Sequence, residues 1–368
     1  MTDKADRHFM QMALGLARRG LGRCWPNPSV GCVIVSPQGQ VVGRGHTGEG
    51  GRPHGETQAL NQAGDAAIGA TAYVSLEPCA HHGQTPPCAD RLVAARLSRV
   101  VIATGDPDTR VAGQGIKILE EAGLQVDFGI CQVEANRLNQ GFFNRIMKQK
   151  PLVTLKVATS LDGRIATKEG ESKWITGPEA RARGHLLRGQ NDAIMVGIGT
   201  VLSDDPGLDC RLPGLGQRSP VRIIVDSGLR LPPECHLVET AAVIPTWVIT
   251  TRPADAKSAI LEKHGVRVIG CKADQDGRVD VMQMMQKLST AGITRLLVEG
   301  GAQLNASLIR ASLVDRLYWF RSCGIIGGDG LPALPSIGLK MLTEMPEFTL
   351  VREGRVGKDT WQEFEIGH

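Results

Sequence analysis

Aromatic residues and net charge are both scarce in this chain. Phe, Trp and Tyr make up 4% of the 368 residues, and the formal net charge is only +4. Proteins that hold unpaired nucleic acid stack its bases on aromatic rings and neutralise its phosphates with a basic surface. The composition therefore argues against a nucleic-acid partner.

Long apolar runs are also missing. No stretch approaches the ~20 apolar residues that a membrane-spanning helix needs, and the polar start from Thr2 to Arg7 lacks the apolar core of a signal peptide. We expect no membrane partner and a cytoplasmic location. The nine cysteines are an odd number, which argues against a disulfide framework. Most are expected to be small buried side chains, but Cys79 and Cys88 differ because of their neighbours.

Length and patterning predict two α/β domains, because the chain exceeds the ~100–200 residues of an average domain. A polar, basic segment that ends in proline, 144–151, separates two series of alternating helices and strands. We therefore place domains at 1–146 and 151–368. In the first series we expect helices at 6–19, 56–67, 88–96 and 115–122, and strands at 30–35, 41–45, 72–76 and 100–103. In the second series we expect strands near 152–157, 192–196, 221–226, 246–250, 295–298, 314–320, 347–352 and 360–366, and helices near 179–189, 254–264, 280–291 and 302–311.

One histidine and two cysteines of the first domain form a metal-binding pattern. His54 stands at the start of an expected helix, Cys79 follows the end of an expected strand, and Cys88 comes nine residues later. One imidazole and two thiolates suit zinc, and a fourth position left for water makes such a site catalytic. Gly83, Pro86 and Pro87 break any helix between the cysteines, so the segment loops out and returns Cys88 to the metal. Each cysteine is expected near a helix start, where the dipole favours a thiolate.

Glu56 is predicted to carry protons rather than to bind the metal. At ~100° per residue it lies on roughly the opposite helical face from His54. The pattern H-x-E, followed by P-C and a second Cys, is the signature of zinc-dependent nucleobase deaminases. In that chemistry zinc lowers the pKa of a bound water towards ~7, and the glutamate transfers a proton from the water to the departing ammonia. A structural zinc site or free core thiols are the alternatives; four residues in this order favour the catalytic interpretation.

Three segments closely resemble the family of bifunctional riboflavin-biosynthesis deaminase/reductases. They are Glu77–Cys88, Pro26–Gly31 and Lys156–Gly163, and the resemblance covers essentially the whole chain. It implies a cytidine-deaminase-like α/β/α layered domain followed by a dihydrofolate-reductase-like α/β domain. It also implies one Zn²⁺ in the deaminase domain, and NADPH as the reductant in the second. The implied reactions are deamination of 2,5-diamino-6-(5-phosphoribosylamino)pyrimidin-4(3H)-one, then reduction of its ribosyl group to ribityl.

The resemblance also implies the residues of the deaminase substrate site. Asn27 and His46 should contact the pyrimidine. The ribose phosphate should be approached by the loop that contains His81, His82 and Gln84, together with Asp106 and Asp108. Gln84 stands where the family is expected to have Lys or Arg, and Asp108 stands where Asn is expected. Both differences reduce the positive potential near a phosphate, and each histidine has a solvated loop position as its alternative.

Two glycine turns in the second domain follow strands and suit cofactor binding. Residues 296–304 form a buried strand, a glycine turn and a helix start, and residues 196–206 follow another strand. Helix-start amides favour phosphate, although most such turns are structural. The resemblance implies NADPH contacts at Ala158, Trp174, Thr200, Asp204, Ser227, Gly301, Ala302, Gln303, Leu304 and Asn305. It implies substrate contacts at Lys156, Ser172, Arg188, Leu208, Arg211 and Glu299. The alternatives are surface charge for Arg188 and Arg211, and a core position for Trp174.

A third glycine motif, Gly43–Gly48, satisfies G-x-G-x-x-G after a strand. A turn follows it instead of the helix that a dinucleotide site needs, so we reject it as such a site.

The favoured hypothesis is a two-step enzyme that acts on a small phosphorylated pyrimidine and forms a homo-oligomer. A second hypothesis is a zinc deaminase that acts on a nucleic-acid base, with the C-terminal domain as a binding module. The low charge and few aromatics count against it. A third is a zinc protein without catalytic activity.

Overall fold

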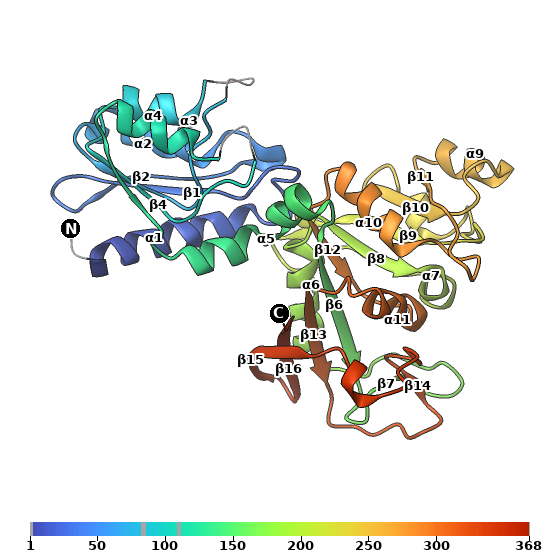
Figure 1. Ribbon diagram of the computed structural model, residues 1–368. Helices are drawn as coiled ribbons and strands as arrows, with labels where there is room; N and C mark the ends of the chain where they lie inside the picture. The colour runs from blue at the N-terminus through green and yellow to red at the C-terminus, as the bar shows by residue number, and fades with distance from the viewer. Residues whose placement is uncertain (1–2, 82–85, 109–111, 368) are drawn as a thin grey trace. The chain divides into compact units, whose positions relative to one another are not determined.

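The computed structural model describes residues 3–81, 86–108 and 112–367 of the chain (Figure 1). It contains two compact units, Met1–Gln149 and Lys150–His368. Within the described residues, no helix is both long and apolar enough to cross a membrane.

The first unit contains a five-stranded sheet in the order β2-β1-β3-β4-β5. Strand β1 runs antiparallel to both β2 and β3, whereas β3, β4 and β5 are parallel. The parallel strands place the loops that follow them at one edge of the sheet, where sites commonly form. The strands are β1 (Gly31–Val35), β2 (Val41–His46), β3 (Thr71–Val74), β4 (Arg99–Ile102) and β5 (Gln125–Phe128).

Helices cover both faces of this sheet and give three layers. Alternation along β1 sends Cys32 and Ile34 to one face and Val33 and Val35 to the other, as the two-residue period of a strand requires. One face is covered by α2 (Gly55–Ala63), α3 (Cys88–Ala94) and α4 (Gln114–Glu121), and the other by α1 (Asp3–Ala17) and α5 (Gln132–Lys148) (Figure 1). The α/β/α prediction is confirmed.

The glycines of the rejected motif have a packing role. A Cβ on Gly43 would lie 2.2 Å from the carbonyl oxygen of Ala59, and one on Gly45 would lie 2.1 Å from that of Gly55. A short 3₁₀ turn, Glu49–Gly51, follows the motif. These glycines therefore allow β2 to approach α2 closely.

The second unit contains a nine-stranded sheet in the order β11-β10-β9-β8-β12-β6-β13-β16-β15. The strands from β11 to β13 are parallel, and β16 and β15 continue the sheet in antiparallel pairs. The strands are β6 (Leu152–Thr159), β8 (Ala193–Gly197), β9 (Val221–Val225), β10 (Thr246–Thr250), β11 (Arg267–Gly270), β12 (Arg295–Val298), β13 (Arg316–Arg321), β15 (Phe348–Val356) and β16 (Asp359–Ile366).

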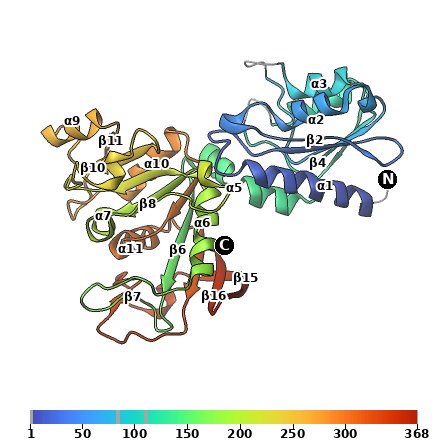
Figure 2. The same cartoon turned by 180° about the vertical axis from the view of Figure 1, so that it is seen from behind.

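Six helices pack in this unit, and one of them carries part of the candidate site. Helix α6 (Pro178–Gly189) lies alongside β6 (Figure 2), where Ala180 and Leu187 pack with Phe320 and Trp361. The other helices are α7 (Ile198–Asp204), α8 (His236–Glu239), α9 (Ala256–Lys263), α10 (Val281–Thr290) and α11 (Ala302–Arg310), and a small sheet pairs β7 (Arg164–Ala166) with β14 (Leu331–Pro332). The unit has the predicted dihydrofolate-reductase-like α/β architecture.

Several elements were not predicted. The largest is α5, which runs to Lys148 and includes much of the segment that the sequence pattern presents as a separator. Its buried residues include Asn139, Gly141 and Asn144, so its apolar periodicity is weak. The other unpredicted elements are short: β5, β7, α7, α8, β11 and β14.

Candidate active sites

His54, Cys79 and Cys88 come together as one potential metal site. Their ligand atoms all lie within 4.8 Å of one another. His54 Nδ1 is 3.2 Å from Cys88 Sγ and 3.6 Å from Cys79 Sγ. Zinc bonds of ~2.0–2.3 Å place tetrahedral ligand atoms roughly 3.5 Å apart, so this donor set fits zinc in both chemistry and spacing.

The local structure explains how the three ligands meet. His54 precedes the first turn of α2 in an extended conformation, and Cys88 is the first residue of α3. Cys79 lies in an irregular segment after β3, and it is near a helix start through space rather than along the chain. The first amide of α3 nevertheless reaches it, since the Cys88 N–H donates to Cys79 Sγ over 3.3 Å. The start of α3 therefore stabilises a thiolate on Cys79, although Cys79 is not part of that helix.

The pKa values of the two thiols shift in opposite directions. A hydrogen bond from Cys88 lowers the pKa of Cys79, and a further bond from His54 adds to this effect. The same Cys79–Cys88 hydrogen bond raises the pKa of Cys88, as does its burial. An acidic thiol beside a second thiol and an imidazole is the donor chemistry that zinc takes.

Glu56 lies inside this site but outside the group of potential ligands. Its side chain is 3% exposed. Oε2 is buried and has no hydrogen-bond partner among the described residues. Burial raises the pKa of Glu56, and the charge of His54 only partly offsets this effect. A carboxyl group with a raised pKa and a free oxygen is suited both to accept and to deliver a proton.

Asn27 and His46 are near the metal-binding residues in the fold. The Asn27 side chain donates to the Gly50 carbonyl over 3.2 Å. His46 ends β2, and its Cα would lie 3.2 Å from a Cβ on Gly55, the residue after His54. His46 Nδ1 lies 2.9 Å from the carbonyl oxygen of its neighbour Thr47. The structure thus places His46 next to the start of α2.

The residues predicted to approach the ribose phosphate fall in two loops. Asp106 and Asp108 follow β4, where the Asp108 amide donates to Asp106 Oδ1 over 2.8 Å. His82 and Gln84 lie outside the described residues.

Glu77 organises the loop after β4, a role that sequence reasoning missed. Its side chain is buried, and its two oxygens accept the amides of Asp106 (3.4 Å), Gly113 (3.1 Å) and Gly115 (3.0 Å). The carboxylate therefore anchors both the start of this loop and the start of α4. The available signal was an acidic residue directly before Pro-Cys at the end of a strand.

Three charged residues meet in the second unit. Glu299, which follows β12, accepts a bidentate hydrogen bond from Arg188 on α6, over 2.7 and 2.9 Å. Lys156 Nζ on β6 lies 3.5 Å from Glu299 Oε2. Burial alone would raise the pKa of Glu299, but the charges and hydrogen bonds of Arg188 and Lys156 outweigh it and bring the pKa to about 2. Since the Arg188 side chain is only 15% exposed, the surface-charge alternative is wrong for this residue.

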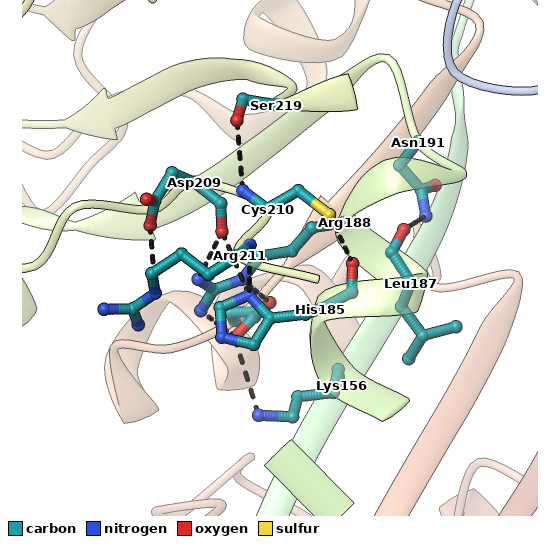
Figure 3. Close-up of polar contacts among 10 residues, drawn as sticks. Lys156, His185, Leu187, Arg188, Asn191, Asp209, Cys210, Arg211 and Ser219 are labelled. Carbon is teal, nitrogen blue, oxygen red and sulfur yellow. Dashed lines mark hydrogen bonds and ion pairs between the residues drawn. The ribbon is translucent and has the colours of Figure 1, made fainter. Parts of the chain in front are cut away.

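Arg211 lies on a loop beside Arg188 (Figure 3), and Leu208 precedes it in the same loop. Arg188 Nη1 donates to the carbonyl of Asp209 over 2.9 Å, and Arg211 Nε lies 3.4 Å from Asp209 Oδ1. Leu208 is buried, whereas the Arg211 side chain is 64% exposed. The structure therefore joins Lys156, Arg188, Glu299 and the loop 208–211 at one place.

Ser172 and Trp174 line a different feature, a pocket of 230 Å³ between the β7 region and the segment after β13. Trp174 is 67% exposed, so its core alternative is wrong. The Arg181 guanidinium lies 4.4 Å from the centre of its ring. An exposed indole with a stacked cation can cover a flat ring of a ligand.

Two glycine turns meet at the edge of the nine-stranded sheet. The Gly197 amide donates to the Gly300 carbonyl over 3.3 Å, and a Cβ on Gly301 would lie 3.3 Å from Gly197 N. Gly301 has φ +86°, which favours glycine. It precedes α11, so the free amides of that helix point to this edge and suit an anionic phosphate.

The other predicted NADPH contacts are arranged around these turns. Thr200 Oγ1 would lie 3.4 Å from a Cβ on Gly300, and Asp204 ends α7 with Oδ1 3.7 Å from Lys173 Nζ. Ser227 follows β9 and accepts the Val279 amide over 3.0 Å. The first turn of α11 contains Ala302, Gln303, Leu304 and Asn305, and Ala158 is a half-buried residue of β6.

Comparison with protein families gives two matches. Residues 151–360 match the RibD C-terminal domain. Residues 3–104 match the cytidine and deoxycytidylate deaminase zinc-binding region. The second match contains all four residues of the H-x-E and P-C motifs and Cys88 as the second cysteine, and ends just after β4.

Curated relatives match along the whole chain. The riboflavin biosynthesis protein RibD of Escherichia coli strain K12 is 40% identical, over 96% of this chain and 97% of its own length. The protein of the same name from Aquifex aeolicus is 39% identical, over 98% of each chain. Because the matches cover both domains, they favour the two-step enzyme. The hypothesis of a nucleic-acid deaminase with a C-terminal binding module is the weaker one.

Solved structures agree with this result. Acinetobacter baumannii RibD has a TM-score of 0.90 at 36% identity, with both chains fully covered. A diaminohydroxyphosphoribosylaminopyrimidine deaminase/5-amino-6-(5-phosphoribosylamino)uracil reductase from Thermotoga maritima has a TM-score of 0.88 at 33% identity, with 99% of each chain covered.

Proposed function

This chain belongs to the RibD family of bifunctional riboflavin-biosynthesis enzymes, and from this premise we propose which of its residues perform each reaction. The enzyme is a hydrolytic deaminase and an NADP-dependent reductase that uses Zn²⁺ and NADPH. We assign deamination of the diaminopyrimidinone phosphate to residues 1–146 and reduction of its ribosyl group to residues 151–368. The two family matches and the separate site in each unit support this division.

His54, Cys79 and Cys88 would hold the zinc ion of the deaminase. Zinc supplies there a Lewis acid that makes water acidic enough to act as a nucleophile near neutral pH. Glu56 accepts a proton from the attacking water at Oε2 and delivers it to the amino group that leaves as ammonia. Asn27 and His46 orient the pyrimidine, and Asp106 and Asp108 lie on the side of the ribose phosphate.

The observation that carries this assignment is the free, buried carboxylate oxygen of Glu56. A buried carboxyl oxygen without a partner costs stability, by about 1–3 kcal/mol or more. Its position beside three potential zinc ligands explains why such a cost is tolerated. A structural zinc site has no need for this group.

In the reductase, Glu299 holds Arg188 and Lys156 in fixed positions. We propose that these three residues, with Ser172, Leu208 and Arg211, bind and orient the sugar of the deaminated intermediate. NADPH, held at the turn from Gly301 and near Thr200, Asp204 and Ser227, supplies the hydride. Ala158 and Trp174 border its nicotinamide end.

We also propose that the enzyme works in the cytoplasm on a free small molecule and assembles from copies of its own chain. The low net charge and the few aromatic rings support a small-molecule substrate over nucleic acid. Sedimentation of the purified protein measures the number of copies.

The test of the proposed function follows two signals separately. The enzyme receives the diaminopyrimidinone phosphate, with and without NADPH, and both ammonia release and NADPH oxidation are measured. Ammonia is expected without NADPH, and NADPH oxidation is expected only when ammonia has formed. Removal of zinc with a chelator should abolish ammonia release but leave reduction of the separately supplied deaminated intermediate. Ammonia release that survives complete removal of zinc would contradict the proposal.

A further inference from the structure

The loop that carries Arg211 is strained at Leu208. This residue is 3% exposed and has φ +50°, a left-handed conformation that side chains rarely adopt. Such a conformation is unfavourable and persists only where the surrounding structure fixes the chain. The contacts of neighbouring elements with this loop therefore determine where Arg211 is held.

His185 on α6 contacts three successive residues of this loop (Figure 3). Its Nδ1 lies 3.1 Å from the carbonyl oxygen of Asp209 and 3.3 Å from the amide nitrogen of Arg211. Its own carbonyl oxygen accepts the Cys210 thiol over 3.3 Å. One residue of the helix thus reaches the backbone on both sides of Cys210.

Both neutral forms of the imidazole hold the loop. With the proton on Nε2, Nδ1 accepts the Arg211 amide; with the proton on Nδ1, it donates to the Asp209 carbonyl. Burial lowers the pKa of His185, and the charges of Arg188 and Arg211 lower it further. The ring is therefore neutral at pH 7 and adds no charge beside the two arginines.

The same helix fixes the charged cluster. Arg188 lies one turn after His185, donates to the Asp209 carbonyl over 2.9 Å and pairs with Glu299. Helix α6 therefore sets the distance between Arg211 and the Arg188–Glu299 pair. Two further contacts support the loop from other elements: the Ser219 hydroxyl accepts the Cys210 amide over 3.1 Å, and Arg222 donates to the Gly207 carbonyl over 3.4 Å.

We propose that His185 is a positioning residue of the reductase, which holds the exposed Arg211 guanidinium where it meets the phosphate of the sugar substrate. This inference rests on the proposed function, because Arg211 is assigned to the substrate there. A guanidinium suits phosphate because its fork of donors matches two phosphate oxygens. A fixed backbone lowers the entropic cost of binding with such a long, exposed side chain.

Two variants of His185 separate positioning from packing. His185→Leu keeps most of the volume and removes the hydrogen-bonding atom. His185→Asn places an oxygen or an amide nitrogen close to the position of Nδ1, so it can accept or donate as the ring does. The control is His264→Leu, because His264 lies on the exposed end of α9 and its Nδ1 also contacts a carbonyl, that of Ile260, over 2.9 Å.

The measurements are the KM for the deaminated substrate, the KM for NADPH, kcat, and the Kd for ribose 5-phosphate by calorimetry. We expect His185→Leu to raise the substrate KM and the ribose 5-phosphate Kd about tenfold, equivalent to ~1.4 kcal/mol. The KM for NADPH, kcat and ammonia release should stay within about twofold. His185→Asn should recover most of the affinity, and His264→Leu should behave as the wild type.

Unchanged ribose 5-phosphate binding in a folded His185→Leu variant would overturn the inference. So would an equal loss in His185→Asn, since the effect would then come from packing alone. These results are distinct from a failure of the proposed function. In that case the wild-type enzyme itself would neither bind ribose 5-phosphate nor oxidise NADPH with the deaminated substrate.

Discussion

Glu56 and Glu299 are both buried carboxylates, yet their surroundings give them opposite properties. Among the described residues, Glu56 Oε2 has no hydrogen-bond partner and no arginine or lysine forms an ion pair with Glu56. Burial raises the pKa of Glu56. Glu299 is paired with Arg188 and Lys156, and its pKa is about 2. The first group is suited to exchange protons, whereas the second remains charged and holds other residues in place. Burial alone does not identify a proton carrier; the partners of the carboxylate do.

The largest expected effect comes from Glu56→Gln. An amide cannot take the water proton, so deamination should fall about 10³-fold. Zinc content should be unchanged because Glu56 lies outside the potential ligand group, and NADPH oxidation with the deaminated substrate should continue. An ammonia assay measures the rate of deamination, and metal analysis measures the zinc content. A near wild-type rate of ammonia release in Glu56→Gln would show that Glu56 is not the proton carrier, and the contrast with Glu299 would then have no functional meaning.

Glu299→Gln should impair the other activity. It removes the anion between Arg188 and Lys156 and leaves two cations without their partner. Losing one member of such a pair costs at least 2–3 kcal/mol, so kcat/KM for reduction should fall roughly 100-fold. Ammonia release should stay within about twofold. A parallel loss of deamination would contradict the separation of the two sites.

The pH dependence of unfolding sharpens the comparison further. Glu299 has a folded-state pKa of about 2, against an ordinary value of 4.5. A carboxyl group whose pKa is lower in the folded state than in the unfolded state stabilises the fold when the pH is above its unfolded-state pKa. This stabilisation is lost as the pH falls towards the folded-state pKa. Of the Glu299 contribution, roughly 2 kcal/mol should be lost between pH 7 and pH 3. Urea unfolding of wild type and Glu299→Gln measures it: their difference should be constant above pH 6 and shrink below pH 4.5. A difference that stays constant down to pH 3 would show that the charge of Glu299 is not responsible.

The smallest expected effect concerns Asp108. Replacing it with Asn removes a negative charge from the side assigned to the ribose phosphate. For a partly exposed charge this is worth roughly 0.2–1 kcal/mol, so the deaminase KM should fall about two- to fivefold, and less at high salt. Asp65→Asn is the control, because Asp65 is exposed in the 3₁₀ turn after α2. An equal change in both variants would mean that general charge, and not the phosphate, is responsible.

The metal site was predictable because its signals are local. His54 and Glu56 are two residues apart, and both cysteines are marked by neighbouring prolines in the sequence. The stabilisation of Cys79 was harder to predict. It depends on the amide of Cys88, and therefore on where α3 begins.

The backbone partners of Glu77 and His185 were not predictable from sequence for a different reason. Both side chains act on backbone amides or carbonyls of segments more than 20 residues away in the chain. Backbone groups are the same at every position, so no residue pattern marks the partner. In the fold, α5 was missed for a related reason. Its buried face uses Asn139 and Asn144, whose polarity hides the helical period.

The chain passes from the first compact unit to the second between Gln149 and Lys150. The position of this boundary bears on how the gene could be divided. Each unit has hydrophobic clusters of its own, and each candidate site draws on residues of one unit alone. A gene divided at this point would keep every residue of one chemistry together in each product.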